Sequence, residues 1–234
     1  MPLSIVTWKW RRADGSTLFT AEYVNRMRSM LERNLHIPHR LLCLTDNRTG
    51  IDPRVECLPL PTEFAGSFRC RRRMWQWSRD RVSLFGPRFL AIDLDLVLTD
   101  DITHLVDRPE PLVMLRIGYA NTLSGSFILS DTGALHGAYE AFARDPVGFC
   151  EATGLQNASD QAMLNLYLKG KAVAEWKEKD GFAVFFGKGY ERFAYLGVGY
   201  NKPTLPKGTR VVVLGSDDLD ALTDPRFAWR EHWR

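Results

Sequence analysis

The chain has 234 residues, of which 45% are hydrophobic and 25% charged, a composition typical of a globular protein and unlike that of a disordered or fibrous one. Its formal net charge of +3 is too small for a protein that binds nucleic acid through a strongly basic surface, so nucleic acid is excluded as an expected partner. The mild positive charge instead suits anionic ligands such as phosphates, or a peripheral contact with an acidic membrane.

The sequence also limits compartment and metal chemistry. Its four cysteines form no CxxC pair, which argues against the common zinc and thioredoxin-type sites. The N-terminal apolar run is too short for a signal peptide, and no stretch approaches the roughly 18–20 apolar residues of a transmembrane helix. We therefore expect a cytoplasmic protein with free thiols, whose membrane contact, if it has one, is peripheral at the inner face.

Hydrophobic periodicity predicts alternating strands and helices in the first half of the chain. In chain order these are a strand at 4–10, a helix at 19–34, strands at 39–45 and 54–60, a basic helix at 67–85 and a very apolar strand at 88–98. Pro59 and Pro61 end the third strand, and Gly86-Pro87 ends the basic helix.

The second half continues with strands at 111–117 and 125–130, a helix at 131–145, a helix at 160–169 with Ser159 as its N-cap, and strands at 171–176, 182–186 and 209–215. This alternation predicts an α/β fold with a mainly parallel central sheet flanked by helices. We expect a single domain over 1–234, with a looser C-terminal segment after about residue 200.

The stretch LAIDLDLVLTDDI, residues 90–102, carries the most distinctive chemistry. On an extended chain Asp93 and Asp95 would point to the same side, at the carboxyl end of a strand where ligands of open α/β sheets gather. Two carboxylates so close together repel each other unless a cation or a proton lies between them. Mg²⁺ commonly binds one or two carboxylates together with substrate phosphates, so a metal on a diphosphate accounts for both charges.

Together with SIVTW, LCLTDN, NTLSGSFILS, ASDQAMLN and the terminal REHWR, this stretch resembles the nucleotide-sugar glycosyltransferases with the GT-A fold. The likeness is to bacterial relatives of the glycogenin and lipopolysaccharide galactosyltransferase family. It implies a GT-A-like domain that transfers a hexose from a nucleotide-sugar, expected to be UDP-linked, to a saccharide, lipid or protein acceptor. In such a domain, residues 1–106 would form the nucleotide-binding half and residues 107–234 the donor-sugar and acceptor half. It also implies that Asp93 and Asp95 form a DxD motif that holds Mn²⁺ or Mg²⁺ on the donor diphosphate, with retention of the anomeric configuration.

The resemblance assigns further roles residue by residue. Thr7 and Trp8 would receive the nucleotide base and ribose at the end of the first strand, although a packed core aromatic is an equal alternative for Trp8. Arg71 and Arg72 would place a cation toward the donor, because a planar guanidinium suits phosphate oxygens. Each arginine also fits a solvated helix face.

Two later segments complete the implied site. Ser124, Gly125 and Ser126 would lie near the donor sugar, with Gly125 allowing close approach of the backbone and either Ser124 or Ser126 bonding sugar hydroxyls. Asp160 and Gln161 would act in catalysis from a helix N-terminus, where Asp160 accepts bonds from sugar hydroxyls or stabilises an oxocarbenium-like transition state.

One expected ligand is missing. Many relatives carry a metal-binding histidine near the C-terminus, and Leu214 or Gly215 stands at the matching place here. His232 belongs to the terminal motif, and Asp217 or Asp218 is the alternative ligand.

Two other functions remain open. Haloacid-dehalogenase-type phosphatases resemble the same stretch, with Asp93 as nucleophile, Asp95 as general acid, Ser130 as the second-motif hydroxyl and Lys177 or Lys179 as the phosphate-binding lysine. The acidic GSDDLD at 215–220 fits that class, but NTLSGS and SDQ then have no role. A non-catalytic nucleotide-sugar-binding protein is the third hypothesis, suggested by the missing histidine.

Overall fold

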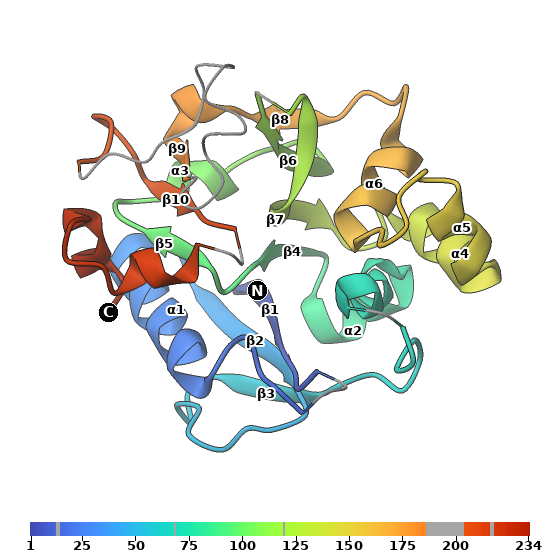
Figure 1. Cartoon of the computed structure of the whole chain (residues 1–234), viewed down its shortest axis with the longest axis horizontal. Helices are drawn as coiled ribbons and strands as arrows, with labels where there is room; N and C mark the ends of the chain where they lie inside the picture. The colour runs from blue at the N-terminus through green and yellow to red at the C-terminus, as the bar shows by residue number, and fades with distance from the viewer. Residues whose placement is uncertain (13–14, 68, 119, 186–203, 216–217) are drawn as a thin grey trace.

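The computed structural model describes residues 1–12, 15–67, 69–118, 120–185, 204–215 and 218–234 (Figure 1). Its centre is a seven-stranded sheet. In order across the sheet the strands are β3 (Glu56–Pro59), β2 (His39–Thr45), β1 (Leu3–Lys9), β4 (Arg88–Ile92), β7 (Thr122–Asp131), β6 (Leu112–Ile117) and β8 (Ala174–Trp176). All neighbours are parallel except β7, which runs antiparallel to both β4 and β6.

A smaller sheet continues from the central strand. It is made of β5 (Leu96–Leu98), β10 (Val211–Val213) and β9 (Phe182–Val184), with β10 in the middle, antiparallel to β5 and parallel to β9. Because β5 follows β4 after residues 93–95 alone, the chain passes from one sheet to the other at the two aspartates.

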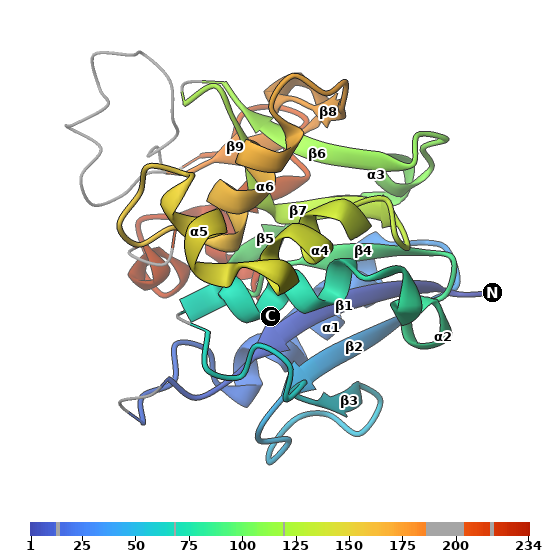
Figure 2. The same cartoon turned by 90° about the vertical axis from the view of Figure 1, so that its right-hand side faces the viewer.

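Helices lie on both faces of the seven-stranded sheet. The α-helices are α1 (Ala21–Asn34), α2 (Val82–Phe85), α3 (Thr103–Val106), α4 (His136–Arg144), α5 (Pro146–Glu151) and α6 (Asp160–Leu168). The described 3₁₀ helices are η1 (Arg69–Trp77), η2 (Arg79–Arg81), η3 (Glu178–Asp180), η6 (Leu219–Leu222) and η7 (Ala228–His232). Figures 1 and 2 show α1 on one face, and α4, α5 and α6 together on the other.

Alternate residues of the strands divide between two hydrophobic cores, as the period of two along a strand requires. Ile5 and Leu90 pack with α1 and the small sheet, whereas Val6 and Phe89 pack with η1, α4 and α6. The α/β fold with a mainly parallel central sheet between helices is therefore confirmed.

Three expected elements differ from the structure. The strand predicted at 88–98 is two strands, because the chain leaves the large sheet after Ile92 and re-enters extended structure only at Leu96. The helix predicted at 67–85 consists of the 3₁₀ helices η1 and η2 followed by the short α-helix α2. The break between η1 and η2 lies at Ser78, whose side chain accepts a hydrogen bond from Asp80 N. The strand predicted at 125–130 begins already at Thr122.

The other elements lie close to their predicted positions, with shifted ends. The helix expected from 131 starts at His136, and α3 and α5 were not predicted. Ser159 caps α6 as expected, accepting a bond from Ala162 N. Phe186, the last residue of the strand predicted at 182–186, lies outside the described residues.

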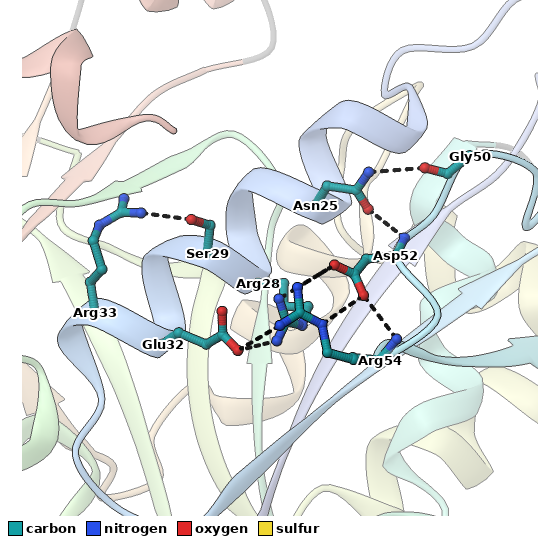
Figure 3. A network of polar contacts seen from close by, with 8 residues as sticks. All are labelled: Asn25, Arg28, Ser29, Glu32, Arg33, Gly50, Asp52 and Arg54. Atoms are coloured by element: carbon teal, nitrogen blue, oxygen red, sulfur yellow. Dashed lines mark hydrogen bonds and ion pairs between the residues drawn. The ribbon is translucent and has the colours of Figure 1, made fainter.

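A polar network joins α1 to the loop between β2 and β3 (Figure 3). The Asn25 amide donates to Gly50 O at 2.9 Å and accepts from Asp52 N at 2.8 Å. Asp52 also accepts from both the main chain and the guanidinium of Arg54, and Arg28 on α1 adds an ion pair 3.4 Å from Asp52. These contacts fix the loop against the helix at a place remote from the two aspartates in sequence.

The C-terminal segment lies beside α1, as the red and blue ribbons of Figure 1 show. The Arg26 guanidinium lies 3.9 Å from the Trp233 ring centroid, and Arg33 donates to the carbonyls of His232 and Arg234, each at 2.7 Å. The terminal REHWR motif thus contributes packing against α1. Within the described ranges, no helix has the length and apolar character needed to cross a bilayer.

Candidate functional site

The candidate site is built on the turn that carries Asp93 and Asp95, at the carboxyl end of β4. Asp93 N donates to Ser126 O of β7 at 2.9 Å, and Asp95 O accepts from Leu214 N, just after β10, at 3.3 Å. Leu94 between them is 1% exposed and belongs to the core on the α1 side. The expectation that both carboxylates project from one extended strand is therefore wrong, because this segment is a turn between two sheets.

Burial raises the pKa values of both carboxyl groups in this turn. Asp95 is 8% exposed, and its Oδ1 has no hydrogen-bond partner among the described residues. Burial, together with the negative charge of Asp93, raises the pKa of Asp95 to about 8. Burial also raises the pKa of Asp93, while the Arg73 guanidinium and the Ser126 hydroxyl oppose that rise. The turn therefore holds a carboxyl oxygen that lacks a compensating partner within the described structure.

Arg73 links this turn to α6. Its Nε donates to Asp160 Oδ2 at 2.7 Å and its Nη2 to Asp160 Oδ1 at 3.0 Å, a two-pronged contact, while Nη1 pairs with Asp93. Asp160 is 2% exposed. Burial alone would lower the pKa of Arg73, but Asp160 and Asp93 raise it well above its usual value. Arg73 is thus a permanent cation between two acidic groups.

The 3₁₀ geometry of η1 explains why this arginine faces the site. With three residues per turn, side chains at i and i+3 lie above one another. Cys70, Arg73 and Gln76 consequently share one face, where Cys70 contacts Asp160 and Gln76 contacts Trp8. Burial and the Asp160 carboxylate raise the pKa of the Cys70 thiol to about 12.

Thr7 and Trp8, the expected nucleotide ligands, lie in the core. Thr7 is 0% exposed, and Trp8 is 5% exposed with its indole N–H donating to Gln76 Oε1 at 2.9 Å. The Trp8 ring makes edge contacts with Trp10 and Trp75, at centroid distances of 6.5 and 6.2 Å. These contacts fit the packed-aromatic interpretation of Trp8, whereas Trp10, directly after β1, is less buried.

Arg71 and Arg72 do not share the partners of Arg73, because each donates to a main-chain carbonyl elsewhere. Arg71 Nε donates to Ala158 O at 2.8 Å, directly before the N-cap of α6. Arg72 donates to Ala65 O at 2.9 Å, lies 5.5 Å from the Trp10 ring centroid and has its pKa lowered by burial. The structure thus brings Arg73, rather than its two neighbours, into contact with Asp93.

The segment Ser124–Ser126 lies in β7, beside both Asp93 and α6. Ser124 is 1% exposed, and its hydroxyl accepts from Ser126 N at 3.2 Å. Gly125 N donates to Gln161 Oε1 at 2.9 Å. A Cβ on Gly125 would lie 3.2 Å from the Cβ of Gln161. The absence of a side chain at Gly125 therefore allows α6 to pack closely against β7.

The residues of this turn have the chemistry of a site for a divalent cation. The unpaired buried oxygen of Asp95 beside Asp93 suits a hard divalent cation, which needs only one or two carboxylates when phosphates complete its ligands. Over the described part of the chain, no three His, Cys, Asp or Glu side chains gather to hold a metal by themselves. The residues therefore fit a cation shared with a diphosphate.

The expected position of the missing histidine does lie at this turn, because Leu214 N bonds Asp95 O. Of the alternative ligands, Asp218 is 5% exposed and its N–H donates to Gly215 O at 2.9 Å, whereas Asp217 lies outside the described residues.

The phosphatase alternative requires the Ser130 hydroxyl, its second motif, to lie beside Asp93, and the sheet register places it elsewhere. Ser130 pairs with Phe89 near the start of β4, while Asp93 follows the end of that strand. At about 3.3 Å per residue, the two are on the order of 13 Å apart along the strand. Ser130 therefore does not lie beside the aspartate that it would assist.

Sequence reasoning missed two residues, Arg73 and Asn165. The signal for Arg73 was present in RCRRR, but the resemblance assigned the cation to Arg71 and Arg72. Asn165 lies one helical turn after Gln161 on α6 and bonds Leu123 through its carboxamide. Its i+4 spacing from Gln161 could have identified it.

Comparison with known proteins shows the fold of the chain. No family model matches the sequence, and no curated protein matches it either. Among solved structures, the apo-form glycosyltransferase GlyE of Streptococcus pneumoniae TIGR4 is similar, with a TM-score of 0.67 and 15% identity over 100% of this chain and 60% of that protein. A second GlyE structure gives a TM-score of 0.66 and 14% identity, over 99% and 60% respectively. The chain spans less than two thirds of these neighbours and has the fold of glycosyltransferases.

Proposed function

We propose that this chain is a glycosyltransferase that moves a hexose from a UDP-linked sugar to a saccharide, lipid or protein acceptor. The observation that carries the proposal is the pair Asp93 and Asp95 at the carboxyl end of the central strand, with a buried carboxyl oxygen that lacks a partner among described residues. Ligands of open α/β sheets bind at this edge. The glycosyltransferase fold supports the choice of substrate class.

Asp93 and Asp95 would hold Mn²⁺ or Mg²⁺, which supplies Lewis-acid neutralisation of the leaving diphosphate. Arg73 contributes a second, fixed positive charge beside Asp93, and its pairing with Asp160 keeps the guanidinium oriented. A cation fixed in advance stabilises developing negative charge without reorganising during the reaction.

The sugar would lie along Ser124–Ser126, where the Ser126 hydroxyl already contacts Asp93. We propose transfer with retention of configuration, in a cytoplasmic protein with a peripheral contact at the inner membrane face. NMR of the first-formed product determines its anomeric configuration, and an inverted anomer would exclude retention.

Thermal denaturation with UDP or UDP-sugars, with and without Mn²⁺, tests the proposed function. The nucleotide should raise the melting temperature only when Mn²⁺ is present, and Asp95→Ala should lose that nucleotide-dependent rise. Absence of any shift with all nucleoside diphosphates would contradict the proposal. Binding without donor hydrolysis or transfer, even with cell extract as acceptor, would instead identify a non-catalytic nucleotide-sugar-binding protein.

A further inference from the structure

The pairing of β6 with β7 is interrupted at the segment expected to meet the sugar. Met114 of β6 pairs with Ile128, but Arg116, two residues later, pairs with Leu123. Four residues of β7, 124–127, therefore lie opposite a single residue of β6. Bulges of this kind redirect side chains and are frequent beside active sites. Backbone groups at such an interruption need other hydrogen-bond partners.

Two side-chain amides of α6 bond the main chain of β7, one at Gly125 within this interruption and one at Leu123 directly before it. Asn165 Oδ1 accepts from Leu123 N at 2.9 Å and from the Thr122 hydroxyl at 3.0 Å. Asn165 Nδ2 donates to Leu123 O and to Gln161 O, each at 2.8 Å. Gln161 Oε1 accepts from Gly125 N at 2.9 Å. The Asn165 carboxamide therefore bonds both the N–H and the C=O of Leu123, as a neighbouring strand would.

The hydrogen-bonding capacity of Asn165 is fully used by the protein. A carboxamide has two donors on nitrogen and two lone pairs on oxygen, and all four are engaged within the chain. A substrate hydroxyl therefore has no position at which to bond Asn165. An effect of this residue on transfer must pass through the β7 segment that it holds.

The opposite edge of the same segment reaches the carboxylate turn. Ser126 O accepts from Asp93 N at 2.9 Å, and the Ser126 hydroxyl contacts the Asp93 side chain. The segment is thus held between α6 on one side and Asp93 on the other. If the α6 contacts were lost, the segment would stay anchored at Asp93, and the serines would shift relative to that carboxylate.

We propose that Asn165 and Gln161 are positioning residues, which act as a substitute strand and set Ser124–Ser126 against the donor sugar. This inference rests on the proposed glycosyltransferase function. It assigns Gln161 an action through Gly125 N, since its amide oxygen already accepts that bond.

The test compares Asn165→Asp, Asn165→Ala and a matched control, Asn25→Ala. The aspartate in Asn165→Asp can still accept a hydrogen bond from Leu123 N but cannot donate one to Leu123 O. This variant therefore tests the donated bond separately from the accepted one. Asn25 is a matched control because it is also an asparagine on a helix, α1, whose side chain donates one hydrogen bond to the main chain of a loop and accepts another from it (Figure 3). Displacing a reacting group by about 1 Å can cost about 100-fold in rate. We expect kcat for UDP-sugar turnover to fall about 10- to 100-fold in both Asn165 variants.

Two further readouts separate positioning from general destabilisation. The dissociation constant for UDP, which lacks the sugar, should stay within about threefold of wild type in the Asn165 variants, on the order of the scatter for sites without direct contact. Asn25→Ala should lower the melting temperature without changing kcat. Equal kcat for Asn165→Ala and Asn25→Ala would overturn the proposal.

Hydrogen exchange tests the inference independently of turnover. Amides in the peptide 121–127 should exchange faster in Asn165→Ala, and those in 48–54 should exchange faster in Asn25→Ala. Unchanged exchange in 121–127 would overturn the role of Asn165. If wild type neither turns over nor binds any UDP-sugar, the proposed function fails, whereas the exchange result still reports on the α6 contact.

Discussion

Replacing Arg73 with alanine is the change to which the candidate site should be most sensitive. It removes the cation from Asp160, whose side chain is 3% exposed, and from Asp93, whose side chain is 20% exposed. Breaking a buried ion pair from one side costs about 3–5 kcal/mol, because the remaining charge stays buried without compensation. The side chain of Arg73 keeps 14% exposure, so we expect about 3 kcal/mol, the lower end of that range.

Differential scanning calorimetry measures the effect. In a domain of this size 1 kcal/mol shifts the melting temperature by about 2–4 °C, so Arg73→Ala should lower it by about 6–12 °C. Arg81→Ala is the matched control: this side chain is 17% exposed and pairs with Glu63, which is 37% exposed. Exposed pairs contribute at most about 1 kcal/mol, and the contact of Arg81 with the Trp75 ring adds a similar amount.

The same variant separates structural from electrostatic effects at the turn. Without Arg73, Asp93 loses its internal cation, and Mn²⁺ added alone should raise the melting temperature of Arg73→Ala more than that of wild type. The reasoning would be refuted if Arg73→Ala were no less stable than Arg81→Ala. It would also be refuted if Mn²⁺ left the variant unaffected while stabilising the wild type.

Three other outcomes are expected. Arg54 holds the pKa of Asp52 well below its usual range, so Asp52→Asn should lower the urea midpoint at pH 7, and its deficit should shrink as the pH falls below about 4. Iodoacetamide at pH 8 should alkylate the half-buried Cys57 faster than Cys70, whose pKa is raised to about 12, as peptide mass spectrometry can establish. Trp8→Phe leaves a buried amide oxygen without its donor and should cost about 1–3 kcal/mol in urea denaturation; an unchanged midpoint would contradict the packed role of Trp8.

The fold was predictable wherever one periodicity dominated the sequence. β1 and β2 alternate between two buried faces, and α1 carries apolar residues at helical spacing, so local pattern and tertiary structure agree. The pattern failed at 88–98, where apolar residues continue through the turn because Leu94 is buried even though it lies outside both strands. Burial, and not strand geometry, produced that apolar run.

The candidate site was predictable as a set of segments but not as a set of contacts. The stretches with Asp93, Ser124–Ser126 and Asp160 do meet at one edge of the sheet, as strand ends and a helix N-terminus should. Which arginine reaches the carboxylates depends on a 3₁₀ period that composition does not reveal. The role of Gly125 depends on how closely α6 approaches, a distance set by packing from other elements.

The turn at Asp93 and Asp95 has a mechanical consequence. The main chain of Asp93 is bonded to β7 in the large sheet, and that of Asp95 to the residue after β10 at the small sheet. A rotation of the small sheet against the large one would therefore strain this turn and move Asp95 relative to Asp93. A ligand that binds both carboxyl groups would connect the two sheets, and part of its binding energy would oppose their relative motion. Strands β5, β9 and β10 should then deform less, including places that no ligand atom reaches.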